Sequence, residues 1–216
     1  MLGEMIRTQW RRVRIPVIIV SLLLLSVPLL IVRSGPTDDV GRVGQWLHYS
    51  EQVGRVIPLL ALGCGLLLGI AAWTDDARGG HVYALSLPLS RERYILYRCI
   101  AGGLPMLVPA LTMLSGGLIA AAAVQLPPGV HAYPVALAVR TLLAILVCYA
   151  IFFAIAVASK HAARVFLLAL VGLISLDLIL SIIEVDFSSI EAVVELLVTW
   201  PGPLAILTGR WALFDV

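Results

Sequence analysis

Five long apolar stretches divide this chain, and the polar segments between them carry their positive charge on alternate sides. The stretches cover residues 15–32, 55–72, 94–124, 134–158 and 165–183. A helix needs about 20 mostly apolar residues to cross a hydrocarbon core about 30 Å thick, and each stretch meets that requirement. We therefore predict an all-α polytopic membrane protein with five transmembrane helices.

The composition leads to the same class of protein. Hydrophobic residues make up 61% of the chain and charged residues 13%, whereas soluble domains carry about 25% charged residues. The polar-leaning segments reach only about 20 to 30 residues, so we predict that residues 1–216 form a single transmembrane domain. The net charge of +2 suits anionic lipid headgroups better than nucleic acid, and we expect no nucleic-acid partner.

Arginine and lysine near the ends of the stretches predict the orientation, because these residues stay in the cytoplasm. Three basic segments fall on one side: Arg7, Arg11, Arg12 and Arg14; Arg78, Arg91, Arg93 and Arg98; and Lys160 and Arg164. The other side holds a mixed loop at 33–54, residues 125–133 without Lys or Arg, and an acidic patch at Glu184, Asp186, Glu191 and Glu195. We predict a cytoplasmic N-terminus and a location in the cell (inner or cytoplasmic) membrane.

The two ends of the chain differ from the apolar stretches. Residues 1–14 mix apolar side chains with arginines, which is the composition of a helix lying in the membrane interface. A disordered leader is the alternative. Residues 184–216 begin as an acidic amphipathic stretch, followed by Trp200-Pro-Gly-Pro203 and a short tail. We expect this segment to be external or re-entrant.

Metal ligands and catalytic groups do not stand out in the sequence. Cys64, Cys99 and Cys148 lie in or at the edge of apolar stretches without metal-ligand spacing, which predicts packing roles. The single lysine, Lys160, is not part of a Gly-Lys-Ser/Thr phosphate loop, so the chain cannot bind ATP in that way. We predict no cofactor or metal in this chain and no enzyme activity of its own.

Residues 73–93, between the second and third stretches, form the most distinctive polar segment. Its first half is charged and contains Gly79-Gly80, and its apolar residues then alternate with small or polar ones up to Pro88. Proline cannot continue a helix, while Ser90 is a good N-cap with Glu92 in the first turn. The pattern predicts a short cytoplasmic helix, a break and a new helix.

This segment resembles the coupling region of the type-2 permeases of ABC transporters. In that family an interfacial helix precedes the first span. The loop after the second span has an acidic residue, a glycine turn, an apolar stretch and Pro-x-Ser-Arg, with a basic residue in the next span. The matching residues are Asp75 or Asp76, Gly79-Gly80, Tyr83 to Leu87, Pro88-Leu-Ser-Arg91 and Arg98. The family commonly has Glu and a later Gly-Thr, where this chain has Asp75-Asp76 and Gly79-Gly80-His81.

The resemblance implies a permease subunit, of an exporter, that uses ATP hydrolysed by a separate ATP-binding-cassette subunit holding ATP and Mg. A second copy, or a similar permease, would complete the transporter. The residues assigned to ATPase coupling are Asp75, Asp76, Arg78, Gly79, Gly80, His81, Tyr83, Leu85, Leu87, Pro88, Ser90 and Arg91. Their apolar members would insert into a groove of the ATPase, with the charged members at its rim.

Several alternatives stay open at this point. The loop can be a solvated connector whose arginines only obey the charge rule for orientation. The chain can be a non-transporting scaffold subunit, or an ATP-independent carrier, which inverted repeats and several intramembrane charges would favour. The type-2 family normally has a sixth span, so residues 184–216 either belong to a five-span variant or stop before that span.

Glycines and prolines inside the stretches predict close packing and helix irregularity. Gly65 and Gly69 form a small-xxx-small face, which suits a contact within the chain or a seam between two copies. The third stretch contains Gly102, Gly103, Pro105, Pro109, Gly116 and Gly117. Such a helix is expected to bend, either lining a pathway or as a kink without a role in transport.

Two charges inside the stretches predict an ion pair. Arg140 and Asp177 each lie six residues from the outer end of their span, about 9 Å deep at 1.5 Å per residue. An unpaired charge at that depth is costly, so we predict an Arg140–Asp177 contact. The alternative is that Arg140 reaches outward to Glu184 or to lipid headgroups while Asp177 faces a polar cavity.

Overall fold

The computed structural model describes part of the chain, namely residues 2–33, 40–78, 90–124, 126, 129–158, 168, 171–172, 175, 199, 202 and 204–215. Its helices are α1 (Leu2–Arg33), α2 (Val40–Gly54), α3 (Val56–Arg78), α5 (Arg91–Gly103), α6 (Leu107–Ala123) and α7 (Pro134–Ala158). Two 3-10 turns, η1 (Leu104–Met106) and η2 (Ala205–Leu207), and two short strands, β1 (His131–Ala132) and β2 (Phe214–Asp215), complete the described elements. The fold is therefore helical, as predicted.

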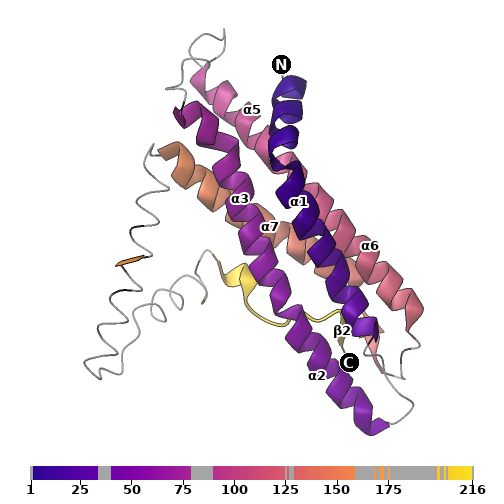
Figure 1. Ribbon diagram of the computed structural model, residues 1–216. Helices are drawn as coiled ribbons and strands as arrows, with labels where there is room; N and C mark the ends of the chain where they lie inside the picture. Colours follow the sequence, from indigo (N-terminus) through magenta and orange to yellow (C-terminus); the bar gives the residue numbers. More distant parts are fainter. Residues whose placement is uncertain are drawn as a thin grey trace.

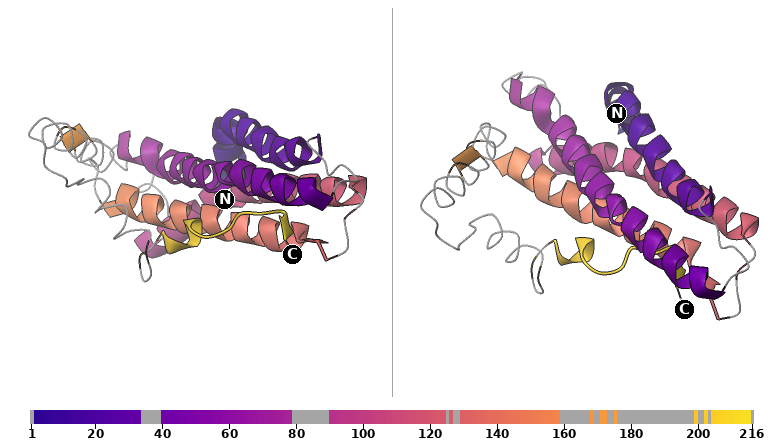
Figure 2. Two further views of the ribbon diagram at one scale, coloured as in Figure 1. Left: turned by 90° about the horizontal axis from the view of Figure 1, so that it is seen from below. Right: turned by 60° about the horizontal axis from the view of Figure 1, so that its bottom comes forward.

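The long helices run side by side and alternate in direction (Figure 1). α3 packs mainly on α7 and α1 mainly on α6, while α6 also contacts α7. One end of the bundle, where α1 and α5 begin and α3 and α7 end, is called the arginine-rich end below. The other end holds β1 and β2 and is called the sheet end, and Figure 2 shows both ends from two further directions. The alternation brings the basic segments in the first turns of α1 and around the start of α5 to one end, as the charge pattern predicted.

Four described helical segments are long and apolar enough to cross a membrane. They are Leu2–Arg33, Trp46–Trp73, Glu92–Ala123 and Pro134–Val157, which correspond to four of the predicted stretches. The fifth predicted stretch, 165–183, lies outside the described residues except at four positions. The five-span count therefore stays a prediction, while a helical membrane protein is supported.

The prediction of a loop at 33–54 was wrong over most of that range, because residues 40–54 form α2. α2 continues into α3 with a single turn residue, Arg55, between them. The reason lies in one buried face: the Trp46 indole N–H donates to the Ile31 carbonyl at 3.1 Å, and Ser50, one turn later, is fully buried. Polar residues on the opposite face hid this helix from a search for apolar stretches.

Residues 2–14, the described part of the leader, are helical and continue into the first span, since α1 runs from Leu2 through Arg33. The position of this part in the membrane interface stays a prediction. Met5, Gln9 and Val13 recur every four residues and are buried, so the buried face of the first span begins in the leader. The two helix-interior prolines of α1 each remove one backbone donor without ending the helix. Because tertiary packing holds both sides of these positions, the helix persists through them.

The third predicted stretch is interrupted where proline was expected to disturb it. A 3-10 turn at Leu104–Met106 separates α5 from α6, and the N–H of Leu104 bonds to the carbonyl of Ile100. Pro105 lacks an N–H and cannot continue the α-helical hydrogen-bond ladder. The predicted interruption of the third helix is therefore present at this 3-10 turn. It lies closer to the arginine-rich end than to the sheet end.

Candidate functional site

The coupling residues predicted from sequence are described only in part. The apolar stretch and the glycine turn lie outside the described residues, and these are Gly79, Gly80, His81, Tyr83, Leu85, Leu87 and Pro88. Asp75, Asp76 and Arg78 lie in the last turns of α3, so the loop predicted to start at residue 73 starts later. The assignment of these residues to ATPase coupling stays a prediction.

The helix start predicted at Ser90 is confirmed. Ser90 occupies the N-cap position of α5 with extended backbone angles, φ −64° and ψ 145°, although its side chain makes no capping hydrogen bond. Arg91 is the first residue of α5 and Glu92 lies in its first turn. The connection between α3 and α5 therefore spans residues 79–90.

The helices on either side of this connection are packed closely together. A Cβ built at Gly102 of α5 would lie 2.6 Å from the Cβ of Ala72 in α3, so the two backbones approach at a distance that only glycine permits. Arg12 of α1 donates to the carbonyl of Ala71 at 3.4 Å. α1, α3 and α5 thus pack together at the level of Ala71 and Ala72 of α3.

A glycine seam joins α3 to α7. A Cβ at Gly65 would lie 2.5 Å from the Cβ of Cys148 and 2.9 Å from the carbonyl oxygen of Ile145. A Cβ at Gly69, one turn further, would lie 2.9 Å from the Cβ of Phe152. Real Cβ atoms do not approach other atoms this closely. Only glycine, whose side chain is a hydrogen atom, therefore fits at both positions. Of the two uses left open by the sequence, the structure shows the contact within the chain.

Tyr149 connects α7 to the irregular part of the third span. Its hydroxyl donates to the carbonyl of Cys99 at 2.7 Å, and its ring stacks on Phe153 with centroids 5.7 Å apart. Gly102 and Gly103 face this ring and leave room for it. The sequence flagged the two glycines but not the tyrosine that they accommodate, because one tyrosine in an apolar helix carries no distinctive signal.

Arg140 of α7 binds the C-terminal segment at the sheet end. Its guanidinium donates to the backbone carbonyls of Thr208 and Arg210 and lies 4.4 Å from the centre of the Trp211 ring. Gly209 has a φ of +85°, a conformation that favours glycine, and it packs against the same guanidinium. Residues 204–215 are called the C-terminal strap below.

The strap is anchored by buried aromatic and aliphatic side chains as well as by Arg140. Trp211, Leu213 and Phe214 are almost completely buried, and the Phe214 ring lies 4.8 Å from that of Trp46 in α2. β2 pairs with β1 in antiparallel register, with Phe214 opposite Ala132. The backbone of Trp211 passes directly over Gly54, where α2 meets α3. The strap therefore ties α2, α3 and α7 together at the sheet end.

The predicted Arg140–Asp177 ion pair involves a residue, Asp177, that lies outside the described residues. It stays a prediction. Arg140 does have partners that the sequence did not indicate, since two of its guanidinium nitrogens donate to strap carbonyls. Backbone carbonyls are present at every residue, so no sequence pattern could identify these two. The described part of the tail predicted at 184–216 packs against the bundle at the sheet end.

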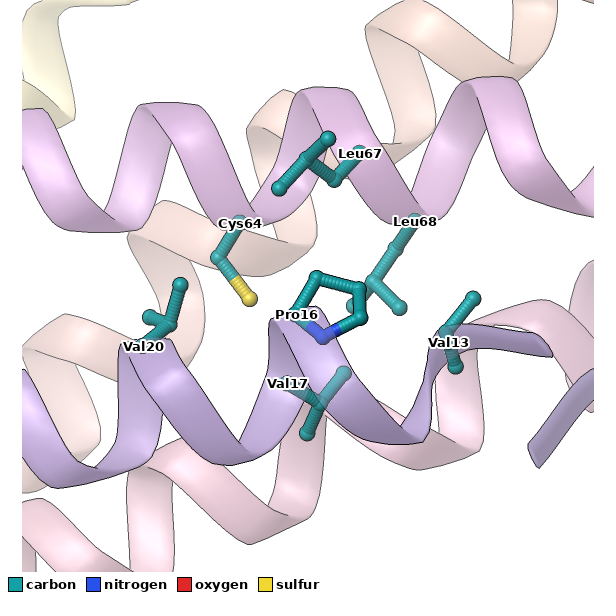
Figure 3. Close-up of a pocket in the computed structure, with 7 residues that line it drawn as sticks. All are labelled: Val13, Pro16, Val17, Val20, Cys64, Leu67 and Leu68. Atoms are coloured by element: carbon teal, nitrogen blue, oxygen red, sulfur yellow. The ribbon is translucent and has the colours of Figure 1, made fainter. Parts of the chain in front are cut away.

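A small apolar hollow lies between α1 and α3 (Figure 3). Its walls are formed by Val13, Pro16, Val17 and Val20 of α1 and by Cys64, Leu67 and Leu68 of α3. It offers no charged or hydrogen-bonding side chain apart from the Cys64 thiol. Among the described residues, no group of three or more His, Cys, Asp or Glu side chains could hold a metal ion. Neither observation provides a site for a polar substrate inside this part of the bundle.

Comparison of the chain with protein-family models, curated proteins and solved structures found no match.

Proposed function

We propose that this chain is the transmembrane permease subunit of an ABC transporter, operating as an exporter with a separate ATP-binding-cassette subunit. The supporting observation is the sequence of residues 79–90, which carry most of the Pro-x-Ser-Arg resemblance. They connect α3 to α5, two antiparallel helices that contact each other where Gly102, near the end of α5, meets Ala72 of α3 (Figure 1). A short segment between two helices that pack on each other is suited to receive force from a partner and pass it into the membrane.

Two contacts provide a route for such a force through the bundle. α3 is fixed to α7 by the glycine seam, and α5 is tied to α7 by the Tyr149–Cys99 hydrogen bond. Both contacts are tight, so a displacement of α3 or α5 at the arginine-rich end is expected to move α7 as well. Packed interfaces shift between discrete arrangements rather than deform continuously.

A transport pathway would lie between two permease chains rather than inside one. The hollow between α1 and α3 is apolar and too small for a solute, and the glycine seam closes the gap between α3 and α7. Neither of these two helix contacts, α1 with α3 or α3 with α7, leaves room for a solute. This supports a functional unit of two copies, or of this chain with a similar permease, on two ATP-binding subunits.

The proposal includes an orientation. The chain lies in a cell membrane with its arginine-rich end on the cytoplasmic side. Single cysteines at Asp38, His131 and Ser188, in a background without the native cysteines, are expected to react with an impermeant maleimide from outside intact cells. His131 is exposed at the sheet end, so its replacement leaves the core unchanged. A cysteine at Arg91 should stay unlabelled, and external labelling there would reverse the orientation.

The coupling assignment predicts that Tyr83→Asp or Leu85→Asp abolishes association with the ATPase. A charge placed in the buried centre of an interface typically removes a hot spot of at least about 2 kcal/mol, or roughly 30-fold in affinity. Copurification of an ATP-binding subunit with the tagged chain, and the ATP hydrolysis that accompanies it, are the quantities to measure.

Ser86→Asp provides the matched control, because it adds the same charge between two apolar positions of the alternating stretch. It is expected to retain most of the association. Equal ATPase association in the Tyr83, Leu85 and Ser86 variants, all inserted normally, would rule out the coupling role of this segment.

A further inference from the structure

The outward face of α1 changes from basic to aliphatic side chains part of the way along the helix. Arg7, Arg11 and Arg14 are spaced four and three residues apart, so they share a face, and all three are exposed. Ile18 and Leu22 continue this face and are 46% and 59% exposed. A basic half and an aliphatic half therefore follow one another along a single exposed stripe, called the α1 stripe below.

The packing of α1 fixes the direction in which this stripe points. Met5, Gln9 and Val13 are buried against the bundle. Arg12, which lies between two members of the stripe in the sequence, is directed to α3 and bonds to the carbonyl of Ala71. The three arginines of the stripe therefore cannot turn inward without breaking the contacts of α1.

The charge of the stripe is not neutralised within the described part of the protein. None of the described residues forms an ion pair with Arg7, Arg11 or Arg14. The nearest carboxylate in sequence is Glu4, about one turn before Arg7. A single carboxylate leaves the three guanidinium groups with an excess of positive charge, which attracts an external anion.

The dimensions of the stripe indicate which anion fits. At 1.5 Å per residue the arginines extend over about 10 Å, and the aliphatic part from Arg14 to Leu22 over about 12 Å more. Guanidinium groups bind phosphate through paired hydrogen bonds, and exposed aliphatic side chains favour an acyl chain. Trp10, half-buried beside the arginines, is a residue type enriched at the level of lipid headgroups.

We propose that the α1 stripe binds an anionic glycerophospholipid. Its phosphate headgroup lies on Arg7, Arg11 and Arg14, and one of its acyl chains runs along Ile18 and Leu22. A zwitterionic headgroup adds an ammonium group that three arginines repel, so the stripe selects lipids with a net negative charge. The bound lipid fixes the depth of α1 in the membrane at the step from Arg14 to the aliphatic residues.

Native mass spectrometry of the full-length chain in a neutral detergent tests this proposal. Phosphatidylglycerol and phosphatidylcholine with the same acyl chains are titrated separately, and the Kd of the first bound lipid is measured. The parent protein is expected to bind phosphatidylglycerol about five-fold more tightly, a preference of about 1 kcal/mol shared by the three arginines. The triple variant Arg7→Gln, Arg11→Gln, Arg14→Gln is expected to bind both lipids equally.

Arg55→Gln is the matched control, since Arg55 is also exposed but lies between α2 and α3 near the sheet end. It should keep the parent selectivity, and circular dichroism should show unchanged helicity in all variants because glutamine is a good helix former. The single variant Arg11→Gln, which preserves most of the stripe, should lower the selectivity by about two-fold.

Three results would overturn the proposal. The first is full selectivity for phosphatidylglycerol in the triple variant, or in Arg11→Gln should the triple variant fail to fold. The second is a loss of selectivity in Arg55→Gln as large as in the stripe variants. The third is displacement of the bound lipid by glycerol phosphate at millimolar concentration, which would show that the arginines take a free phosphate and that the aliphatic part of the stripe contributes nothing.

Discussion

Replacing Gly65 with alanine is expected to lower the free energy of unfolding by about 3 kcal/mol, at the upper end of the range for overpacked cores. The added methyl group would lie 2.5 Å from the Cβ of Cys148 and 2.8 Å from the backbone nitrogen of Tyr149. Backbone atoms cannot rotate away as a side chain can, so α3 and α7 must separate. Reversible unfolding in mixed detergent micelles, followed by circular dichroism, measures the change.

Two neighbouring glycines of α3 turn this prediction into a graded series. Gly69→Ala is expected to cost less than Gly65→Ala, because its closest contact would be 2.9 Å. Gly63→Ala should cost nothing, since no atom lies within 4 Å of a Cβ at this position and alanine favours a helix more than glycine does. Equal losses at Gly63 and Gly65 would show that the seam between α3 and α7 is not as tight as described.

Replacing Arg140 with lysine is expected to release the C-terminal strap even though the positive charge is kept. Lysine cannot reproduce the planar fork that reaches the carbonyls of Thr208 and Arg210 together, nor stack in the same way on Trp211. Hydrogen bonds to charged groups contribute about 1.5–3 kcal/mol each and a cation–π contact about 0.5–2 kcal/mol. Because these contributions are not additive, we expect a total loss of about 3 kcal/mol.

Hydrogen exchange of the strap provides the measurement. The N–H of Tyr133 donates to the carbonyl of Leu213 at 2.9 Å, so release of the strap also exposes this amide. Peptides covering the strap and residues 131–133 are expected to exchange at least ten-fold faster in Arg140→Lys, with a larger effect in Arg140→Ala. The α3–α7 seam should keep its protection.

Arg210→Ala is the control for this experiment. Arg210 also lies in the strap, but its pairs with Glu51 at 3.6 Å and Asp215 at 3.3 Å are at the surface, where its side chain is 66% exposed. Such pairs contribute about 0–1 kcal/mol. Faster exchange in Arg210→Ala than in Arg140→Lys would mean that the surface ion pairs, and not Arg140, hold the strap.

The described long helices could be located from the sequence because apolar length alone defines them. α2 could not, since its buried face consists of single residues one turn apart, Trp46 and Ser50, within a polar segment. That the leader continues into the helix of the first span could not be predicted, for a related reason. Its buried face was interrupted by arginines in the sequence, and only the packing of α1 shows that they lie on other faces of the same helix.

The contacts that hold the bundle together were predictable to different degrees. Gly65 and Gly69 indicated a close helix contact. The pattern says nothing about which helix is the partner, so it could not identify α7. Arg140 stood out as a charge inside a span, and its need for polar partners followed from that. The partners themselves are backbone carbonyls brought close by the turn at Gly209, which depends on tertiary structure and leaves no pattern in the sequence.

The most direct test of the proposed function is affinity purification of the tagged chain from its native membrane, with ATP hydrolysis measured on the purified material. A permease of the proposed kind is expected to bring down an ATP-binding-cassette subunit together with vanadate-sensitive ATP hydrolysis. Purification of the intact, membrane-embedded chain without such a subunit and without ATP hydrolysis would contradict the assignment to an ABC transporter.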